Sequence, residues 1–275
     1  MGFKKRRMTT MGKLDNRVAV VTGAAVGNGC GAAFKLAEHG AKVMLLDVSD
    51  GVYETAKKIK DKFGADTEAF VADVRKFDEI KKAADAIIAK YSRIDILINN
   101  AGVCNIVPFL EMSDEIRDRM LDINFKGVWN CSKAVIPYMV KANYGKIVNL
   151  SSVTGPMVVD TGETAYASTK AAIWGLTKAL AVEFAKQNIT VNAVCPGYIF
   201  TPMAESIAKE SNPANPQQVL DGIAAAVPME RLGTIEELGD VVAFLASDES
   251  RYITGTQIVI DGGSTLPESF SAVGI

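Results

Sequence analysis

The chain has 275 residues, of which 48% are hydrophobic and 23% are charged, a composition typical of a globular protein. Lys and Arg total 30 and Asp and Glu total 32, so the net charge of -2 gives no electrostatic basis for binding nucleic acid or an anionic membrane. No apolar run in the sequence approaches the roughly 20 residues that a membrane-spanning helix needs.

Cysteine and histidine usage narrows the class of site further. The four cysteines lie far apart and form no CxxC motif, so we expect free thiols in a reducing, cytoplasmic compartment. The single histidine, His39, stands before Gly40 at a predicted helix end, where it suits the last turn. Because there is no second histidine, we expect no metal site. A Ser-His-Asp hydrolase would have to use His39, and we do not expect one because no nucleophile-elbow sequence accompanies that histidine.

The chain begins with a basic stretch at residues 4–7 (Lys-Lys-Arg-Arg) that no apolar segment follows. A secretory signal needs such a segment, so we expect residues 1–15 to form a flexible N-terminal arm. An arm that folds over a neighbouring subunit is the alternative. No change in composition marks a linker, and residues 16–275 are predicted to form a single domain.

Between residues 17 and 260, short apolar, β-branched runs alternate with longer amphipathic stretches. The runs predict strands at 18–22, 42–47, 67–73, 95–99, 145–151, 190–195 and 257–260. The amphipathic stretches predict helices over about 28–39, 52–63, 76–91, 114–142, 164–187 and 234–247. The strands are almost continuously apolar, as is typical of strands covered on both faces. The alternation predicts an α/β fold, a doubly wound, seven-stranded parallel sheet flanked by helices on both faces.

The region 202–228 interrupts this alternation after the sixth predicted strand. Residues 211–216 (Ser-Asn-Pro-Ala-Asn-Pro) separate two short helical segments, and Pro228 closes the excursion. An insertion at this position predicts a lid over a ligand crevice. An ordinary surface excursion is the alternative.

A glycine-rich loop connects the first predicted strand to the first predicted helix. Its glycines, Gly23, Gly27 and Gly29, allow a tight turn and a close approach of the backbone to a pyrophosphate at the helix N-terminus. Asp47 ends the second predicted strand, where a carboxylate accepts hydrogen bonds from adenosine ribose hydroxyls and repels a 2′-phosphate. The pattern predicts a Rossmann-type dinucleotide-binding domain that prefers NAD(H) to NADP(H).

Tyr166 and Lys170 lie one helical turn apart in the stretch 164–187, with Ser151 and Ser152 shortly before them. An ammonium group near a buried phenol favours the phenolate and lowers the pKa of the phenol, which makes the tyrosine a useful base. The arrangement therefore predicts proton transfer to and from an alcohol or carbonyl oxygen.

Several motifs follow one another in the order and spacing of a known family. They are the glycine loop, the turn at residues 99–102 (Asn-Asn-Ala-Gly) and the Tyr166/Lys170 pair. From about residue 16 to residue 263 the chain resembles the short-chain dehydrogenase/reductase family in its shorter form. Within that family, stretches such as residues 150–155 and 202–208 are similar to a group of bacterial oxidoreductases.

The resemblance implies a role for each matching residue. It implies a catalytic tetrad of Asn124, Ser152, Tyr166 and Lys170, with Ser151 as the alternative to Ser152 because the gap to the tyrosine is one residue longer than usual. It implies dinucleotide contacts for Gly23, Gly27, Asn28, Gly29, Asp47, Asp73, Val74, Asn100, Ala101, Gly102, Tyr166, Lys170, Pro196, Gly197, Ile199 and Thr201.

In the mechanism that the resemblance implies, Tyr166 takes the proton of a substrate hydroxyl as a hydride passes between the same carbon and the nicotinamide. Lys170 lowers the pKa of Tyr166, Ser152 donates a hydrogen bond to the substrate oxygen, and Asn124 holds a water that connects Lys170 to solvent. We therefore expect an NAD(H)-dependent oxidoreductase that interconverts a secondary alcohol and a ketone. A non-catalytic dinucleotide-binding redox sensor is the alternative of another class, which the complete tetrad disfavours.

Residues expected near the nicotinamide are mostly apolar and include no arginine that could clamp an anionic substrate. They are Val103, Ile106, Val107, Pro156, Met157, Val158, Val159, Tyr198, Phe200 and Met203, of which Met157, Val159, Phe200 and Met203 are the candidate substrate contacts. This set favours an apolar, hydroxysteroid-like ketone or secondary alcohol. A polyol or sugar (gluconate-type) substrate that meets Asp160, Glu163 and Glu205 is the alternative.

The stretches 114–142 and 164–187 are long and carry apolar residues beyond one stripe. Family members pair these helices across subunits, so the resemblance implies a homotetramer, or at least a homodimer. We expect a small-molecule ketone or secondary alcohol as the other partner, and neither nucleic acid nor a membrane.

Overall fold

The computed structural model describes residues 12–267. Most of the predicted N-terminal arm, residues 1–11, therefore lies outside the described residues. Seven strands form one parallel sheet in the order β3-β2-β1-β4-β5-β6-β7, which confirms the predicted Rossmann-type fold. The strands are β1 Val18–Thr22, β2 Lys42–Asp47, β3 Thr67–Val71, β4 Ile96–Asn99, β5 Gly145–Leu150, β6 Ile189–Pro196 and β7 Gln257–Ile260.

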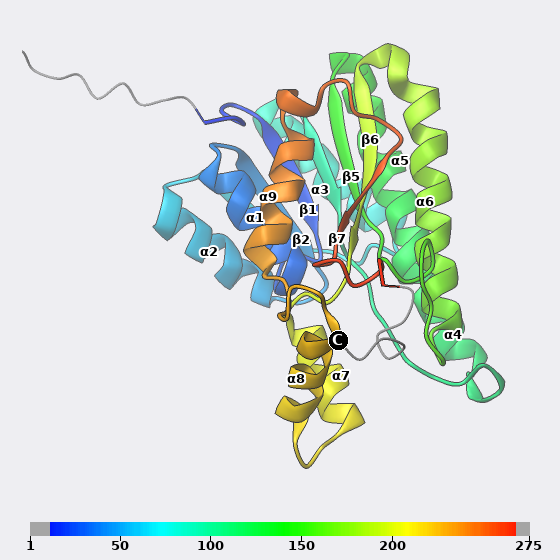
Figure 1. The fold of residues 1–275 in the computed structure, drawn as a ribbon. Coiled ribbons are helices and arrows are strands. Elements are labelled where there is room, and N and C mark those ends of the chain that lie inside the picture. Colours follow the sequence, from blue (N-terminus) through cyan, green and yellow to red (C-terminus); the bar gives the residue numbers. More distant parts are fainter. Residues whose placement is uncertain (1–11, 268–275) are drawn as a thin grey trace, which may run out of the picture.

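Helices cover both faces of the sheet (Figure 1). One face carries α1 Gly27–Glu38, α2 Gly51–Phe63 and α9 Ile235–Ala246, and the other carries α3 Phe77–Tyr91, α5 Gly127–Ala142 and α6 Thr164–Phe184. α1 and α9 approach closely because glycines lie at their crossing. A Cβ added to Gly31 would lie 2.4 Å from the carbonyl oxygen of Ile235. Within residues 12–267, no helix has both the length and the hydrophobicity needed to cross a bilayer.

Strands β1 to β6 contribute to two hydrophobic cores, one on each face of the sheet, whereas β7 contributes only to the core beneath α1, α2 and α9. In β1, Ala19 and Val21 face the core beneath α1, α2 and α9, whereas Val18 and Val20 face the core beneath α3 and α5. Burial of apolar surface stabilises a fold by about 25 cal/mol per Å², so a strand covered on both faces gains from apolar residues at every position. This explains why the strands read as continuous apolar runs rather than as alternating ones.

The predicted helix 114–142 has an irregular turn in its middle. α4 Asp114–Met120 begins after Ser113, whose hydroxyl accepts a hydrogen bond from the N–H of Ile116 (3.4 Å). Between α4 and α5, Leu121–Lys126 form a wider π-helical turn that carries Asn124. Such turns within α-helices occur frequently at functional sites.

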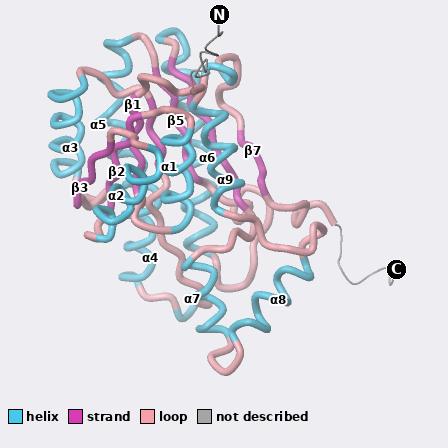
Figure 2. The backbone as a smooth tube through the Cα atoms, turned by 90° about the vertical axis from the view of Figure 1, so that its left-hand side faces the viewer, coloured by secondary structure: helices cyan, strands magenta, loops and turns pink. Residues whose placement is uncertain are grey.

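After β6 the chain leaves the sheet and forms two short helices, α7 Pro202–Ser211 and α8 Pro216–Ala226. The side chains of Thr201 and Asn215 cap these helices by accepting hydrogen bonds from backbone N–H groups of the first turns (3.3 and 3.2 Å). Figures 1 and 2 show the two helices projecting together beyond one end of the sheet. The predicted insertion 202–228 is therefore a helical pair that follows the carboxyl end of β6.

Candidate active site

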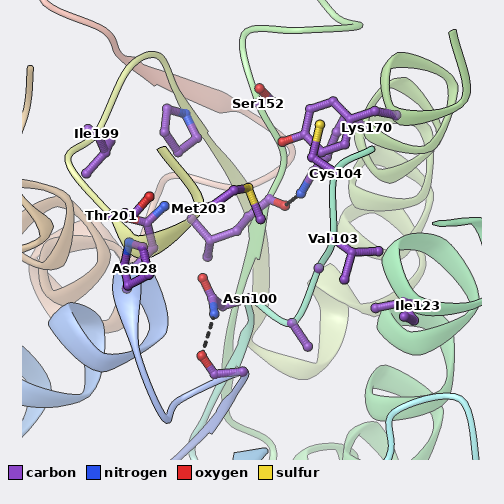
Figure 3. Close-up of a pocket in the computed structure, with 18 of the residues that line it drawn as sticks. Asn28, Asn100, Val103, Cys104, Ile123, Ser152, Lys170, Ile199, Thr201 and Met203 are labelled. Atoms are coloured by element: carbon purple, nitrogen blue, oxygen red, sulfur yellow. Dashed lines mark hydrogen bonds between the residues drawn. The ribbon is translucent and has the colours of Figure 1, made fainter. Parts of the chain in front are cut away.

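A pocket of about 650 Å³ opens at the carboxyl ends of the parallel strands, where open α/β sheets bind ligands. Loops that follow the strands line it, together with the start of α6 and residues of α7 and α8. Figure 3 shows Ser152 and Lys170 on one side of the pocket and Asn28 and Thr201 on the other, with Met203 between them. One pocket therefore joins the glycine loop to three of the four predicted catalytic residues, Ser152, Tyr166 and Lys170.

The glycine loop packs tightly against the turn that follows β4. The side-chain amide of Asn100 donates hydrogen bonds to the backbone carbonyls of Thr22 (3.0 Å) and Gly23 (2.9 Å). Gly23 has a φ of 63°, in the left-handed region that favours glycine. A Cβ added to Gly29 would lie 2.2 Å from the carbonyl oxygen of Gly23, so only glycine fits there. The loop backbone is thereby held in one conformation.

The start of α1 is suited to an anionic ligand. Its N-cap residue, Val26, provides no side-chain hydrogen bond, so the N–H groups of the first turn and the positive end of the helix dipole are free to bind a phosphate. The buried Oδ1 of Asn28 has no hydrogen-bond partner among residues 12–267. A pyrophosphate and a ribose hydroxyl would satisfy these groups, so the residues present fit a dinucleotide.

Two aspartates lie on the β2 and β3 side of the pocket. The Asp47 carboxylate accepts hydrogen bonds from the backbone N–H groups of Ala25 and Ser49, both at 2.9 Å, which fix it beside the glycine loop. Hydrogen bonds from the Arg75 guanidinium hold the pKa of Asp73 below its usual range. Asp47 is therefore the carboxylate placed to accept hydrogen bonds from a ribose, since Asp73 is occupied by its cation.

The two adjacent serines after β5 have different surroundings. The Ser151 hydroxyl is buried and donates a hydrogen bond to the backbone carbonyl of Lys170 (2.9 Å). The Ser152 hydroxyl accepts a hydrogen bond from the N–H of Thr154 (3.1 Å). Burial raises the pKa of the Tyr166 phenol, and hydrogen bonding to Ser152 opposes part of that rise. Ser152 is thus the serine beside the tyrosine, whereas Ser151 braces α6.

Tyr166 and Lys170 line the pocket from the first two turns of α6. The Lys170 Nζ lies 5.5 Å from the centroid of the Tyr166 ring and donates a hydrogen bond to the backbone carbonyl of Leu150 (2.8 Å). Burial lowers the pKa of Lys170 to about 8 and raises the pKa of Tyr166. We expected the ammonium to lower the pKa of the phenol, but in the structure the loss of solvation dominates and keeps the phenol protonated.

Asn124 lies behind the pocket wall. Its fully buried side chain accepts a hydrogen bond from the N–H of Val103 (2.8 Å) and donates to the Val103 carbonyl (2.9 Å) and the Thr169 hydroxyl (3.1 Å). Both of its side-chain N–H groups are therefore occupied within the protein. The amide connects the π-helical turn to the loop after β4 and to α6, which carries Tyr166 and Lys170.

The structure brings almost all of the predicted dinucleotide contacts into one pocket. Its wall includes Gly23, Gly27, Asn28, Asp47, Asp73, Val74, Asn100, Ala101, Gly102, Tyr166, Lys170, Pro196, Gly197, Ile199 and Thr201. Gly29 is buried outside the wall, against the carbonyl of Gly23. Of the candidate substrate contacts, Met203 lies in the wall, whereas Met157, Val159 and Phe200 lie outside it and are exposed.

Other wall residues were not anticipated from the sequence. Ile207 and Ile223 come from α7 and α8, and Ile207 lies one helical turn after Met203, a spacing that could have revealed it. Cys104 also lines the pocket, and burial raises the pKa of its thiol to about 11. Arg119 is part of the wall as well, although we expected no arginine among the residues that line the substrate side.

The chain is similar to known proteins in sequence and in fold. The sequence model of a family described as enoyl-(acyl carrier protein) reductase matches residues 23–265, from the glycine loop to beyond β7. The chain belongs to the short-chain dehydrogenase/reductase family. Members of the short-chain dehydrogenase/reductase family bind a nicotinamide dinucleotide and act as oxidoreductases on small molecules.

Individual short-chain dehydrogenases/reductases are similar over nearly the whole chain. Oxidoreductase UcpA of Escherichia coli (strain K12) is 56% identical over 265 residues, which cover 96% of this chain and 100% of the relative. This finding confirms the predicted likeness to a group of bacterial oxidoreductases.

Two solved structures of the short-chain dehydrogenase/reductase fold superpose closely on this one. A levodione reductase has a TM-score of 0.89 and 33% identity and covers 92% of this chain and 98% of its own. The ligand-free aldohexose dehydrogenase of Thermoplasma acidophilum has a TM-score of 0.86 and 33% identity and covers 96% of this chain and 99% of its own. The same fold thus serves proteins named for different substrates.

Proposed function

We propose that this protein is an NAD(H)-dependent oxidoreductase that interconverts a secondary alcohol and a ketone. The observation that carries the proposal is the placement of Ser152, Tyr166 and Lys170 in the wall of the pocket that also contains the glycine loop. A dinucleotide bound at that loop would supply or accept the hydride. A protein that only senses the redox state has no use for a phenol, a hydroxyl and an ammonium that converge beside the site.

In this proposal the chain's own side chains handle the proton. In the reducing direction the Tyr166 phenol, which burial keeps protonated, donates its proton to the carbonyl oxygen. Ser152 donates a hydrogen bond to the same oxygen as negative charge develops there. When Lys170 is protonated, its positive charge stabilises the phenolate that remains on Tyr166. Because burial lowers the pKa of Lys170 to about 8, this side chain can exchange protons near neutral pH. Asn124 acts as a positioning residue, because its amide joins α6 to the loop after β4.

The preference for NAD(H) rests on Asp47. Its fixed carboxylate beside the glycine loop would accept hydrogen bonds from the ribose and repel a 2′-phosphate. The next residue, Val48, is an exposed apolar side chain and offers no charge to balance a phosphate. Arg75 is in the same wall, but its guanidinium is paired with Asp73.

For the substrate we propose an apolar, hydroxysteroid-like ketone or alcohol. Support comes from the aliphatic side chains that Met203, Ile207 and Ile223 present to the pocket from α7 and α8, the helical pair that we propose as a lid. A polyol or sugar is the second candidate, because Glu163 places a carboxylate in the same wall, whereas Asp160 and Glu205 lie outside it. The names levodione reductase and aldohexose dehydrogenase illustrate that this fold accommodates different substrates.

We also propose a homotetramer, or at least a homodimer, in the cytoplasm. Large apolar side chains are exposed on the two longest helices, Trp129 and Val140 on α5 and Val182 on α6, and such groups favour contact between subunits. All four cysteines are free thiols, which suits a reducing compartment. Light scattering tests the assembly, since a mass near the 29.4 kDa of one chain would contradict it.

An NADH-absorbance assay over steroid ketones, cyclic ketones and sugars, repeated with NADPH, tests the function. We expect turnover of ketones with NADH and a higher melting temperature when NAD(H) is present. Turnover of sugars alone would replace the hydroxysteroid class by the polyol class. Thermal stabilisation by NAD(H) without turnover of any member of the panel would contradict the enzyme and favour a redox sensor.

A further inference from the structure

Glu163 places a partly buried carboxylate in the pocket wall, one helical turn before Tyr166. It immediately precedes α6, the helix that carries the catalytic pair. Burial raises the pKa values of Tyr166, Cys104 and Tyr198, and the negative charge of Glu163 adds to each of these shifts. The carboxylate therefore lies near three groups that line the substrate side of the pocket.

Helix capping does not account for this carboxylate. Glu163 is the N-cap residue of α6, but its side chain accepts no hydrogen bond from the first turn of that helix. Its Oε2 instead accepts a hydrogen bond from the backbone N–H of Asp160 (3.1 Å). Burial raises the pKa of Glu163, and no cation among residues 12–267 contributes to that pKa. The carboxylate thus lines the pocket without a charged partner.

A partly buried carboxylate without a cation is costly to keep ionised. The negative charge of Glu163 also destabilises the phenolate form of Tyr166, because like charges repel. A hydrogen-bond donor on the substrate would offset both costs. Glu163 and Tyr166 line the same pocket three residues apart. A substrate whose reacting oxygen meets Tyr166 can therefore present the substituent on its next carbon to the Glu163 carboxylate.

We propose, on the basis of the proposed function, that Glu163 is a specificity-determining residue that accepts a hydrogen bond from a hydroxyl group next to the reacting carbon. The substrate class is then an α-hydroxy ketone in the reducing direction and a vicinal diol in the oxidising direction. Its apolar remainder packs against Met203, Ile207 and Ile223. The carboxylate rejects substrates with an anionic group at the same place.

The contribution of this hydrogen bond can be measured with two ketones, 2-hydroxycyclohexanone and cyclohexanone. They differ only in the hydroxyl group that would donate it. We expect the wild-type protein to reduce the hydroxylated ketone with a kcat/KM about 10- to 100-fold higher, the range expected for a hydrogen bond to a charged group. Glu163→Leu should bring the ratio close to one, mainly through KM, and Glu163→Gln, which keeps an acceptor, should restore part of it. Glu54→Leu removes an exposed carboxylate of α2 that does not line the pocket, and should leave the ratio unchanged.

The outcomes separate this proposal from the proposed function. An unchanged ratio in Glu163→Leu, or a wild-type protein that favours ketones without a neighbouring hydroxyl, overturns the role of Glu163 alone. An equal loss on both ketones, together with a lower melting temperature, shows a structural role and also overturns it. A wild-type protein that reduces no ketone of any kind with NADH contradicts the proposed function itself.

Discussion

The two sides of the pocket are built in different ways. The dinucleotide side consists mainly of backbone: Gly23 and Gly29 allow close packing, Asn100 fastens the loop, and the first turn of α1 offers free N–H groups. The substrate side consists of side chains such as Met203 and Glu163, which come from segments far apart in the sequence. Because the pyrophosphate is the same in every dinucleotide, one loop geometry is enough to bind it. On the substrate side, a change of side chain can change which substrate is accepted.

This difference means that each side can be altered separately. Changes to the glycine loop should act on dinucleotide binding and on folding together, because the loop is packed against the turn after β4. Changes to side chains of the substrate side should act on turnover and selectivity with little effect on dinucleotide binding. Tyr166 and Lys170 stand between the two sides and allow the sharpest tests.

The largest effect is expected from Tyr166→Phe, which removes the hydroxyl but keeps the ring. Loss of a positioned acid–base group lowers kcat by about 10²- to 10⁴-fold. The dissociation constant of NADH, measured by fluorescence, should change little, because the glycine loop is untouched. A variant with wild-type turnover would show that the phenol is not the proton donor.

Gly29→Ala should distort the glycine loop on the dinucleotide side of the pocket. The new Cβ would lie 2.2 Å from the Gly23 carbonyl oxygen, so we expect a loss of about 1–3 kcal/mol in the free energy of unfolding and weaker NADH binding. Urea denaturation and fluorescence titration measure the two effects. Gly222→Ala in α8 is the matched control: its Cβ meets nothing within 4 Å, and we expect a gain of about 0.5–1 kcal/mol. Equal effects at both glycines would refute the packing argument.

Asp47→Ser should change the choice between dinucleotides. Removal of the carboxylate takes away an acceptor for the ribose and the repulsion of a 2′-phosphate, so the ratio of kcat/KM for NADH to that for NADPH should fall about tenfold. Steady-state kinetics with both dinucleotides measures this ratio. If the wild-type protein already favours NADPH, the assignment of Asp47 is wrong.

Lys170→Met should stabilise the protein at pH 7 while it abolishes turnover. Burial lowers the folded-state pKa of Lys170 to about 8, below its ordinary value of 10.5. Below pH 8 the wild-type protein therefore carries the full cost of a buried ammonium, which is relieved as pH rises towards the unfolded-state value. We expect the variant to be about 1–2 kcal/mol more stable at pH 7, after the loss of the hydrogen bond to Leu150. The difference should shrink between pH 8 and 10.5, and a pH-independent difference would contradict the burial of the charge.

The fold could be predicted because strands buried on both faces appear in the sequence as short, continuous apolar runs. The strands at 18–22, 42–47 and 257–260 have the predicted bounds. The π-helical turn at Leu121–Lys126 was not predicted, because one extra residue in a turn hardly disturbs the apolar pattern of a long helix.

The candidate site could be predicted only where spacing along the chain reflects spacing in the protein. The glycine loop and the Tyr166/Lys170 pair are of this kind. Ile223 reaches the pocket only through the packing of distant segments, and no local pattern marks it. The raised pKa of Tyr166 depends on how deeply the phenol is buried, which residue spacing does not reveal.

Transfer of deuterium tests the central claim most directly. NADH with deuterium at both C4 positions is incubated with a ketone that the protein reduces, and the alcohol is examined by mass spectrometry. The account predicts one deuterium on the carbinol carbon with the wild-type protein and almost none formed by Tyr166→Phe in the same time. Alcohol without deuterium, or equally fast labelling by Tyr166→Phe, would contradict it.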